Sequence, residues 1–510
     1  MKRLFASFLS LSLLAAACTV SQPQTDTPTD TLPSATPAAP TPVPDPMQIP
    51  WDDRSIFKSG LITSEQHVLD ELNGASVYHI EFTLADNLNA KTGTEEIRYT
   101  NKEDVELNEV HFRLFPNILG GEMTVSNLTI NDQPVTPEYD LNDSLMIVRL
   151  PAPLEIGQSI VFKMDYSVTV PRSLQLNYGV LAYANEVLAL AHAYPVIAVY
   201  DDEGWNAEIP PQDGDVAYQD VAFYIVQIRA PKGVTLVTSG RTISLDEDGQ
   251  TQVLTVANGP ARDFYLAASP NYEEFSQTFG EVTIRAYAPA GDKEGAEFAI
   301  DVASRSMEVF SQRYAPYPYT ELDIVSTPTL ALGIEYPGAI AITSRIYDID
   351  SEINGTPANI YMESTVAHEV GHQWFYSLVG DDQLDDPWLD ESLTQFITLQ
   401  YYIDRYGAGP ADGFKSSLEG RWARVGNAKI PIGMPVANYQ GAEYSAIVYG
   451  RGPLFFVALQ DEMGRDAFDS FMKEYTETLS WDIATPEYLQ TLAETHCACE
   501  LQPLFDEWVY

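Results

Sequence analysis

The feature that most constrains the fold is a change in the spacing of hydrophobic residues near residue 271. Before this point apolar and polar residues alternate, as in Tyr78 to Leu84, which is typical of strands with one buried face. Asn-Gly and Asp-Gly pairs punctuate this part and favour tight turns. We therefore expect a multi-domain α+β chain, with an all-β sandwich in residues 51–270 and a mainly helical domain in residues 271–510.

Three stretches of the second domain have helical spacing. One covers residues 298–314 and ends at a proline-rich cluster, and another covers residues 468–475. In the third, hydrophobic residues recur every four positions from 366 to 378, which predicts one helix with a buried stripe. Residues 282–287 are predicted to be a short strand near the start of this domain.

The N-terminus has the composition of an export signal. Residues 1–17 open with two basic residues, continue with a short apolar stretch and end in three alanines before Cys18. A stretch this short is typical of a signal peptide, not of a membrane span. The cysteine after small residues resembles a bacterial lipobox, which implies a lipid anchor on Cys18, with simple secretion as the alternative. Residues 18–50 are rich in Thr and Pro and are predicted to be an extended tether.

The charge balance excludes one class of partner. Among 510 residues there are 28 Lys and Arg against 73 Asp and Glu, a formal net charge of -45. Such a surface repels phosphate backbones, so no nucleic-acid partner is expected. The acidic excess fits solubility outside the cell or attraction of cationic substrates, and the sequence does not separate these two interpretations.

The segment His368-Glu369-Val370-Gly371-His372 carries the candidate chemistry. Histidines four residues apart on a helix lie on one face, so both imidazoles can bind one metal ion. A catalytic zinc site needs three protein ligands and a water. Glu391, with eighteen residues between it and His372, is predicted to be the third ligand. Glu369 then faces a zinc-bound water as the general base, and one Zn²⁺ per chain is expected.

These motifs bring a family resemblance into view. HEVGHQW followed by WLDE resembles the gluzincin metallopeptidases of the aminopeptidase N and leukotriene hydrolase family. The stretches at 99–101 and 111–117 are similar to strands of that family's N-terminal β domain. Tyr444 and Tyr449 resemble its paired tyrosines, and by this match Tyr449 is the catalytic tyrosine that stabilises the oxyanion. The resemblance implies an N-terminal β-sandwich on a thermolysin-like zinc peptidase domain.

A second match bears on the substrate. The family's exopeptidase signature is a Gly-x-Met-Glu-Asn loop whose glutamate binds the free α-amine of a peptide. The corresponding stretch here is Leu332-Gly333-Ile334-Glu335-Tyr336. It keeps the acid as Glu335, but the first Gly, the Met and the Asn of the signature are replaced. Glu335 is thus the candidate substrate-binding residue, and the predicted activity is removal of N-terminal residues from peptides. Glu186 falls near the position of the family's second amine-binding acid.

Alternatives to an aminopeptidase remain open. The sequence ends where the catalytic domain should finish, and a missing C-terminal helical domain would open the cleft to internal cleavage of longer peptides. The alternative that is not an enzyme is a catalytically silent lipoprotein that binds peptides, although all four zinc-site residues are present. Asp390 and Glu363 are further acids that could orient the histidines.

We expect a location outside the cytoplasm, with the protein anchored to a bacterial membrane or secreted. Peptides are the expected substrates. Cys497 and Cys499 are read as small buried side chains, with a disulfide between them as the alternative.

Overall fold

The part of the chain that the structure describes is residues 45–211, 214 and 218–510 of a computed structural model. The expected signal peptide, Cys18 and most of the tether lie outside these residues. Residues 45–510 belong to one unit. Within the described ranges, no helix combines the length and hydrophobicity needed to cross a lipid bilayer.

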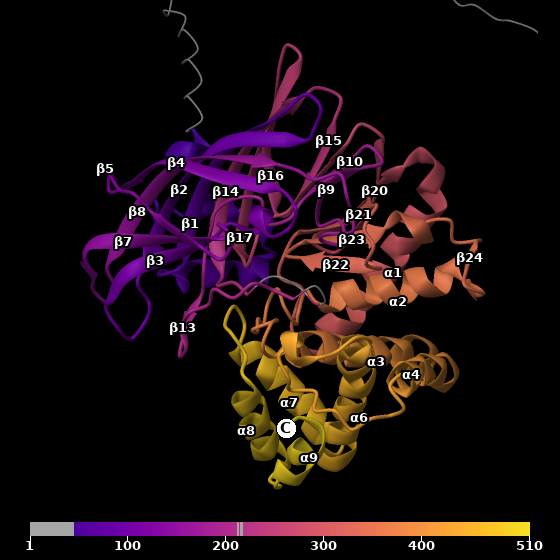
Figure 1. Ribbon diagram of the computed structural model, residues 1–510. Helices are drawn as coiled ribbons and strands as arrows, with labels where there is room; N and C mark the ends of the chain where they lie inside the picture. Colours follow the sequence, from indigo (N-terminus) through magenta and orange to yellow (C-terminus); the bar gives the residue numbers. More distant parts are fainter. Residues whose placement is uncertain (1–44, 212–213, 215–217) are drawn as a thin grey trace, which may run out of the picture. The chain divides into compact units, whose positions relative to one another are not determined.

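The alternating segments of the first half form a large sheet (Figure 1). Strand β1 (Ser76–Leu84) pairs antiparallel with β2 (Ala90–Thr100) and parallel with β14 (Ala222–Pro231). The alternation places Tyr78 and Ile80 in the core, as predicted. The sheet has eight strands in the order β16-β17-β14-β1-β2-β8-β4-β5. Its other strands are β16 (Arg241–Asp248), β17 (Thr251–Ala261), β8 (Ser159–Thr169), β4 (Glu122–Ile130) and β5 (Gln133–Pro134).

A second sheet shares a hydrophobic core with the first, which confirms the sandwich. Its strand order is β11-β3-β7-β6. Val110, Phe112 and Val148 from this sheet join Phe82 and Phe162 from the large one in the same buried cluster. The strands are β3 (Leu107–Arg113), β6 (Glu138–Asp140), β7 (Leu145–Leu154) and β11 (Val196–Ile197).

A third sheet, β15-β18-β10-β9, is buried on both faces. In β10 (Val187–Leu190), Leu188 and Leu190 join the sandwich core, whereas Val187 and Ala189 join a cluster with Val325 and Ala341 of the second domain. Because successive side chains of a strand point to opposite faces, this strand is hydrophobic throughout. The remaining strands are β9 (Leu181–Ala184), β15 (Thr235–Thr238) and β18 (Leu266–Ser269).

The second domain contains a five-stranded sheet in the order β19-β20-β21-β23-β22. Its edge strand is β22 (Gly333–Tyr336), which carries Glu335, and β23 (Ala339–Thr343) lies inside the sheet. The strand predicted from the sequence at 282–287 is β20 of this sheet. The domain boundary at 270–271 stays a prediction, and the chain changes sheets between β18 and β19. The other strands are β19 (Tyr272–Phe279), β20 (Val282–Pro289) and β21 (Glu321–Thr327).

Two helices contribute to the core beside this sheet. Helix α1 (Lys293–Arg313) contains the predicted helical stretch. Helix α2 (Ala358–Gly371) is shorter than predicted, since it ends at Gly371 and leaves Trp374 and Leu378 beyond it. Both residues are nevertheless buried, because the chain turns back through Tyr376, whose φ is 127°. The hydrophobic repeat therefore continued past the end of the helix.

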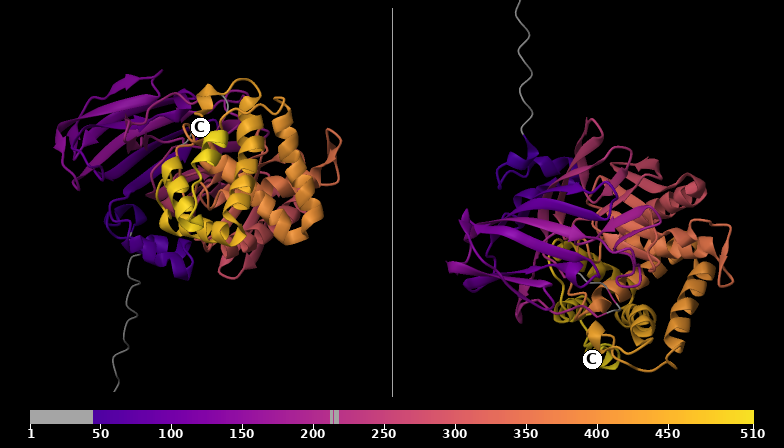
Figure 2. Two further views of the ribbon diagram at one scale, coloured as in Figure 1. Left: turned by 90° about the horizontal axis from the view of Figure 1, so that it is seen from below. Right: turned by 45° about the horizontal axis from the view of Figure 1, so that its top comes forward.

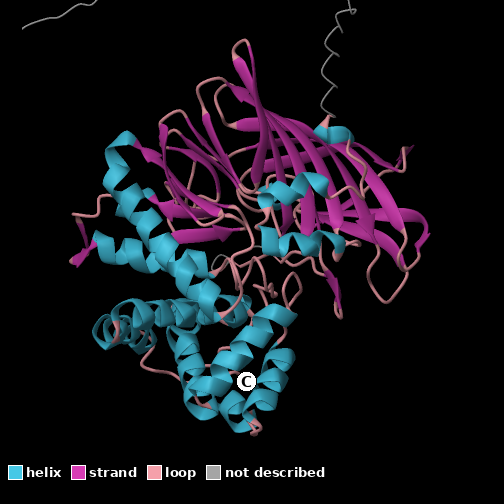
Figure 3. Ribbon diagram, turned by 180° about the vertical axis from the view of Figure 1, so that it is seen from behind, coloured by secondary structure: helices cyan, strands magenta, loops and turns pink. Residues whose placement is uncertain are grey.

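The remaining helices gather together at the C-terminal end, beside the strands (Figures 2 and 3). A disulfide joins Cys497 to Cys499, so the expectation of two small buried side chains was wrong. Ala498 between them has a left-handed conformation and forms the C-cap of α8. The helices are α3 (Leu393–Tyr406), α4 (Ala408–Ala423), α5 (Glu443–Ala446), α6 (Gly452–Met463), α7 (Arg465–Thr478), α8 (Pro486–Cys497) and α9 (Gln502–Trp508).

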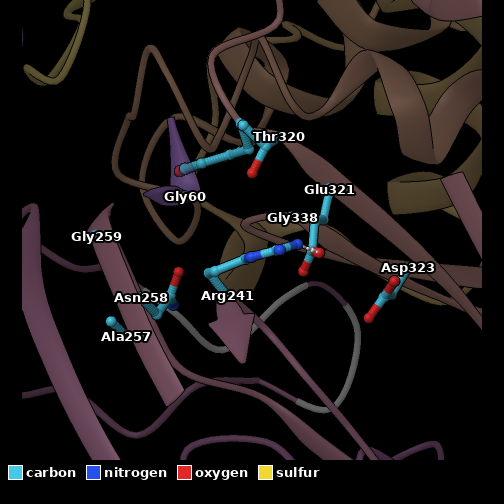
Figure 4. Close-up of a pocket in the computed structure, with 11 residues that line it drawn as sticks. Gly60, Arg241, Ala257, Asn258, Gly259, Thr320, Glu321, Asp323 and Gly338 are labelled. Atoms are coloured by element: carbon cyan, nitrogen blue, oxygen red, sulfur yellow. Dashed lines mark hydrogen bonds and ion pairs between the residues drawn. The ribbon is translucent and has the colours of Figure 1, made fainter. Parts of the chain in front are cut away.

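An ion pair joins the large sheet to the five-stranded sheet beside a small cavity (Figure 4). Arg241 of β16 contacts Glu321 of β21, and Arg285 Nη2 of the neighbouring strand β20 lies 2.8 Å from the same carboxylate. Gly338 also lines this cavity, and its N–H donates to Gln373 Oε1 over 2.9 Å. The cavity thus lies behind the turn that follows Glu335, and none of the predicted zinc-site residues lines it.

Candidate active site

The last turn of α2 and the residue that caps it present the predicted motif. His368, Glu369 and His372 are all buried. Their spacing puts both imidazoles on one side of the helix, where His368 Nε2 and His372 Nε2 lie 3.1 Å apart. The backbone beyond His372 bends back, and His372 Nδ1 lies 3.0 Å from the carbonyl oxygen of Phe375. This contact orients the imidazole so that Nε2 faces His368.

Glu391 completes a set of three donors. It lies on η7 (Trp388–Ser392), a single π-helical turn before α3, a geometry that recurs at functional sites. Its Oε2 lies 3.1 Å from His368 Nε2 and 3.6 Å from His372 Nε2. The three ligand atoms fall within 4.8 Å of one another. The structure thus brings together all three residues that the sequence predicted as metal ligands.

The donor set fits a zinc ion. Two nitrogens bound to a tetrahedral zinc lie about 3.3 Å apart, close to the observed 3.1 Å. Burial, reinforced by the neighbouring His372, lowers the pKa of His368 to about 4. That imidazole is therefore neutral at physiological pH and has a lone pair to donate. Two imidazoles and one carboxylate, with space for a water, are the ligand set of a catalytic zinc site.

An acid beside the ligands orients one of them. Asp390 Oδ1 lies 2.5 Å from His372 Nδ1, the arrangement in which a carboxylate fixes the tautomer of a metal-binding histidine. Asp390 Oδ2 also accepts from Gln383 Nε2 over 2.5 Å. Glu363, the other acid considered from the sequence, lies elsewhere and accepts from Tyr401 and Tyr406.

Glu369 sits against the edge strand of the catalytic sheet. A β-carbon at Gly333 would overlap its carboxylate, so only glycine allows β22 to approach so closely. One oxygen of Glu369 also lies within 4.8 Å of donor atoms of His372 and Glu335. The predicted base therefore lies beside the metal ligands without belonging to the His368–His372–Glu391 set.

Tyr449 reaches the same site from a second π-helical turn, η9 (Ile447–Arg451). Its hydroxyl donates a short hydrogen bond to Glu391 Oε1, and its ring centroid lies 6.2 Å from that of His368. Ser392 Oγ of η7 donates to the carbonyl oxygen of Val448 over 2.5 Å. The two π turns are thus bonded to each other, and together they hold a metal ligand and the predicted catalytic tyrosine.

Glu335 lies close to the predicted base and to one metal ligand, because its carboxylate falls within 4.8 Å of donor atoms of Glu369 and His372. Its Oε1 accepts from Gln383 Nε2 over 3.2 Å. Burial, with the nearby Asp390 and Glu369, raises the pKa of Glu335 well above its usual range, although His372 opposes this shift. A cationic group bound here would restore the charged carboxylate.

Glu186, the other acid considered for amine binding, does not join the site. It lies exposed in the turn between β9 and β10, with φ of 63°, and accepts from the side chain of Asn271 over 2.9 Å. Gln383, by contrast, was not predicted from the sequence, although its side-chain amide donates to both Glu335 and Asp390. No motif marks it, because its role depends on the fold of the 380–386 loop.

Comparisons with known proteins agree with this geometry. Residues 298–508 match the peptidase family M1 domain. The chain is 22% identical to "Aminopeptidase M1-B" of Oryza sativa subsp. japonica over 402 residues, which cover 76% of this chain and 45% of that protein. It is 24% identical to "Probable aminopeptidase 2" of Sulfurisphaera tokodaii over 297 residues, 56% of this chain and 38% of that protein. The chain thus spans less than half the length of these curated relatives.

Among solved structures, the M1 zinc metallopeptidase from Deinococcus radiodurans has a similar fold. The TM-score is 0.63 at 19% identity, over 86% of this chain and 94% of that one. A two-domain M1 zinc metallopeptidase mutant bound to L-arginine gives the same TM-score and identity, over 85% and 93% of the two chains. The matched domain, the shared fold and the zinc-binding geometry agree with one another: residues 298–508 match the peptidase family M1 domain, and the chain is similar to aminopeptidase N-like zinc metallopeptidases of that family.

Proposed function

We propose that this protein is a zinc-dependent aminopeptidase that removes N-terminal residues from peptides outside the cytoplasm. The observation that carries the proposal is the position of Glu335, a buried carboxylate whose oxygen lies within 4.8 Å of donor atoms of Glu369 and His372. A carboxylate placed there can bind the free α-ammonium of a peptide by charge-assisted hydrogen bonds. The scissile carbonyl then lies one residue away, at the metal site.

The residues around the site have distinct roles in hydrolysis. His368, His372 and Glu391 would hold zinc, which when bound lowers the pKa of a water and polarises a carbonyl. Glu369 accepts a proton from the attacking water and passes it to the departing amine. Tyr449 can turn its hydroxyl from Glu391 toward the oxygen on which negative charge develops. Asp390 keeps His372 in the tautomer that presents Nε2.

Solved structures with a similar fold also support the proposed substrate class. Their solved structures are described as bound to L-arginine, to L-tryptophan and to a Tyr-Ser-Ala substrate. These ligands are free amino acids and a short peptide, which fit a site that recognises an unblocked amine. We therefore take Tyr-Ser-Ala as the test peptide for this protein.

The decisive measurement compares Tyr-Ser-Ala with its N-acetylated form on the zinc-loaded protein. Because acetylation removes the charge that Glu335 would bind, the free peptide should be cleaved roughly ten- to a hundredfold faster. Glu335→Gln should reduce this preference while zinc remains bound. Equal rates for the two peptides would instead favour an enzyme that cleaves internally.

A second variant distinguishes a peptidase from a lipoprotein that binds peptides without cleaving them. Glu369→Gln keeps the shape of the side chain but cannot accept the proton, so zinc content should persist while hydrolysis is lost. Undiminished hydrolysis by this variant would refute Glu369 as the base. A wild-type protein that binds zinc and peptide yet cleaves neither would support the silent lipoprotein.

The proposed location rests on the two ends of the chain. Residues 1–17 and Cys18 have the pattern of a lipoprotein signal. The Cys497–Cys499 disulfide fits an oxidising compartment, where such bonds persist. Cys18→Ala should abolish incorporation of a labelled fatty acid and release the protein from the membrane fraction. If the wild-type protein takes up no lipid and is soluble after export, it is simply secreted.

A further inference from the structure

One cationic side chain lies beside the candidate site without a role in the chemistry described above. Arg421 occupies the last turn of α4 and is half-buried. Its guanidinium carbon lies 5.8 Å from the centroid of the Tyr449 ring. The hydroxyl of the same tyrosine contacts Glu391. The Tyr449 ring therefore lies between the Arg421 guanidinium and a predicted metal ligand.

The backbone fixes this position. A β-carbon at Gly450 would lie 2.8 Å from the backbone nitrogen of Trp422 and 3.0 Å from Cβ of Arg421. Only glycine therefore lets η9 pack so closely on α4, and this contact ties Arg421 to the turn that carries Tyr449. The η9 turn is in turn bonded to η7 through Ser392 and Val448. Arg421 is thus held relative to the metal ligands by one close packing contact, between η9 and α4, and one hydrogen bond, between η7 and η9.

Among the described residues, no direct ion pair or side-chain hydrogen bond joins the Arg421 guanidinium to an acid, although acids outnumber bases by 73 to 28 in the sequence. Glu391 favours the cation only through longer-range attraction. Burial lowers the pKa of Arg421, which means that its surroundings disfavour the cation. Such a guanidinium gains most from an anion that arrives with a ligand, and its planar fork matches a carboxylate.

We propose that Arg421 binds the C-terminal carboxylate of short peptide substrates. The proposal rests on the proposed aminopeptidase function and narrows its substrate class to di- and tripeptides. Glu335 clusters with Glu369 and His372, whereas Arg421 lies against Tyr449 beside Glu391. The two charged groups therefore lie near different metal ligands, Glu335 near His372 and Arg421 near Glu391. An extended chain spans about 3.3–3.6 Å per residue, so only a short peptide can reach both.

The test compares Tyr-Ser-Ala with its C-terminal amide in the zinc-loaded full-length protein. The wild type should cleave the free acid at least about tenfold more efficiently, through a lower KM, because a charge-assisted bond contributes that much. Arg421→Gln should bring the acid-to-amide ratio of kcat/KM close to one. Arg424→Gln is the matched control, since Arg424 caps the same helix but is exposed, and its ratio should match the wild type.

Two results would overturn the proposal. One is a wild-type ratio near one. The other is an Arg421→Gln variant that loses activity equally on acid and amide, which would assign Arg421 a purely structural or Tyr449-directed role. Calorimetric binding of both peptides to Glu369→Gln protein, with and without Arg421→Gln, gives the same comparison without hydrolysis. If these variants bind the acid more tightly than the amide, while the wild-type protein cleaves neither peptide, the carboxylate site is supported and the proposed function fails.

Discussion

Asp390 is the residue that the structure adds most clearly to the metal site. Its carboxylate lies 2.5 Å from His372 Nδ1, so Asp390→Asn should weaken zinc binding roughly 10- to 100-fold. Competition with a chelator at defined free zinc measures this affinity. Glu363→Gln is the control, because Glu363 is an acid of α2 that bonds tyrosines and not histidines. Equal zinc affinity in the wild type and Asp390→Asn would contradict the role.

At this scale the sequence predicted the residues that a local motif fixes. His368, Glu369 and His372 lie within one helical repeat, so their geometry follows from the helix itself. Asp390 was only one acid among many, and nothing in the sequence showed which acid meets a histidine. Glu186 falls near the family's second amine-binding acid in the sequence, but its carboxylate accepts from Asn271 and belongs to neither cluster of possible metal ligands among the described residues.

Among the elements, the two π-helical turns η7 and η9 define the site's geometry. A β-carbon at Gly452 would overlap the side chain of Ser392, so Gly452→Ala should push η7 and η9 apart. Because a displacement of about 1 Å can cost 100-fold in rate, we expect kcat to fall at least about tenfold with zinc retained. The double variant Ser392→Gly, Gly452→Ala removes the overlap and should recover part of the activity. If the double variant is no better than the single one, steric separation is not the cause.

Regular helices and strands were easier to predict from the sequence than the points where a helix ends or changes its hydrogen-bonding pattern. The faces of β1 and β3 followed from strict alternation, because a strand places every second residue on the same side. The end of α2 at Gly371 did not follow, since Trp374 and Leu378 continue the hydrophobic repeat from a non-helical turn and are still buried. The π turns share the composition of ordinary helix, so their extra residue leaves no mark in the hydrophobic spacing.

At the scale of the whole molecule, the spacing of hydrophobic residues could not predict which distant segments of the chain pack together. The parallel pairing of β1 with β14 joins segments far apart in sequence. Arg262, buried after β17, donates to the backbone carbonyl oxygens of Gln219, Tyr376, Leu378 and Asp482. These bonds tie the end of the large sheet to the loop that follows the zinc-binding motif. No local pattern distinguishes such an arginine from an exposed one, because its partners are backbone atoms.

Next to this arginine, Asp263 provides a test of the junction through pH. Its Oδ2 accepts from the Tyr376 hydroxyl over 2.6 Å, and burial raises its pKa to about 7 although that hydrogen bond opposes the shift. The folded state therefore binds a proton that the unfolded chain releases near pH 4. The stabilising contribution is complete below that pH and is lost as pH rises through about 7.

Asp263→Asn removes this titration while keeping an acceptor for Tyr376. Between pH 5.5 and pH 8, the wild type should lose roughly 2 kcal/mol of unfolding free energy more than the variant, since each pKa unit corresponds to about 1.4 kcal/mol. Urea unfolding of both proteins at the two pH values, with zinc in excess, measures the difference. Asp482→Asn is the control, because only the backbone carbonyl of Asp482 meets Arg262. Parallel pH profiles for wild type and Asp263→Asn would contradict the prediction, because they would show that Asp263 is ionised in the folded protein throughout this range.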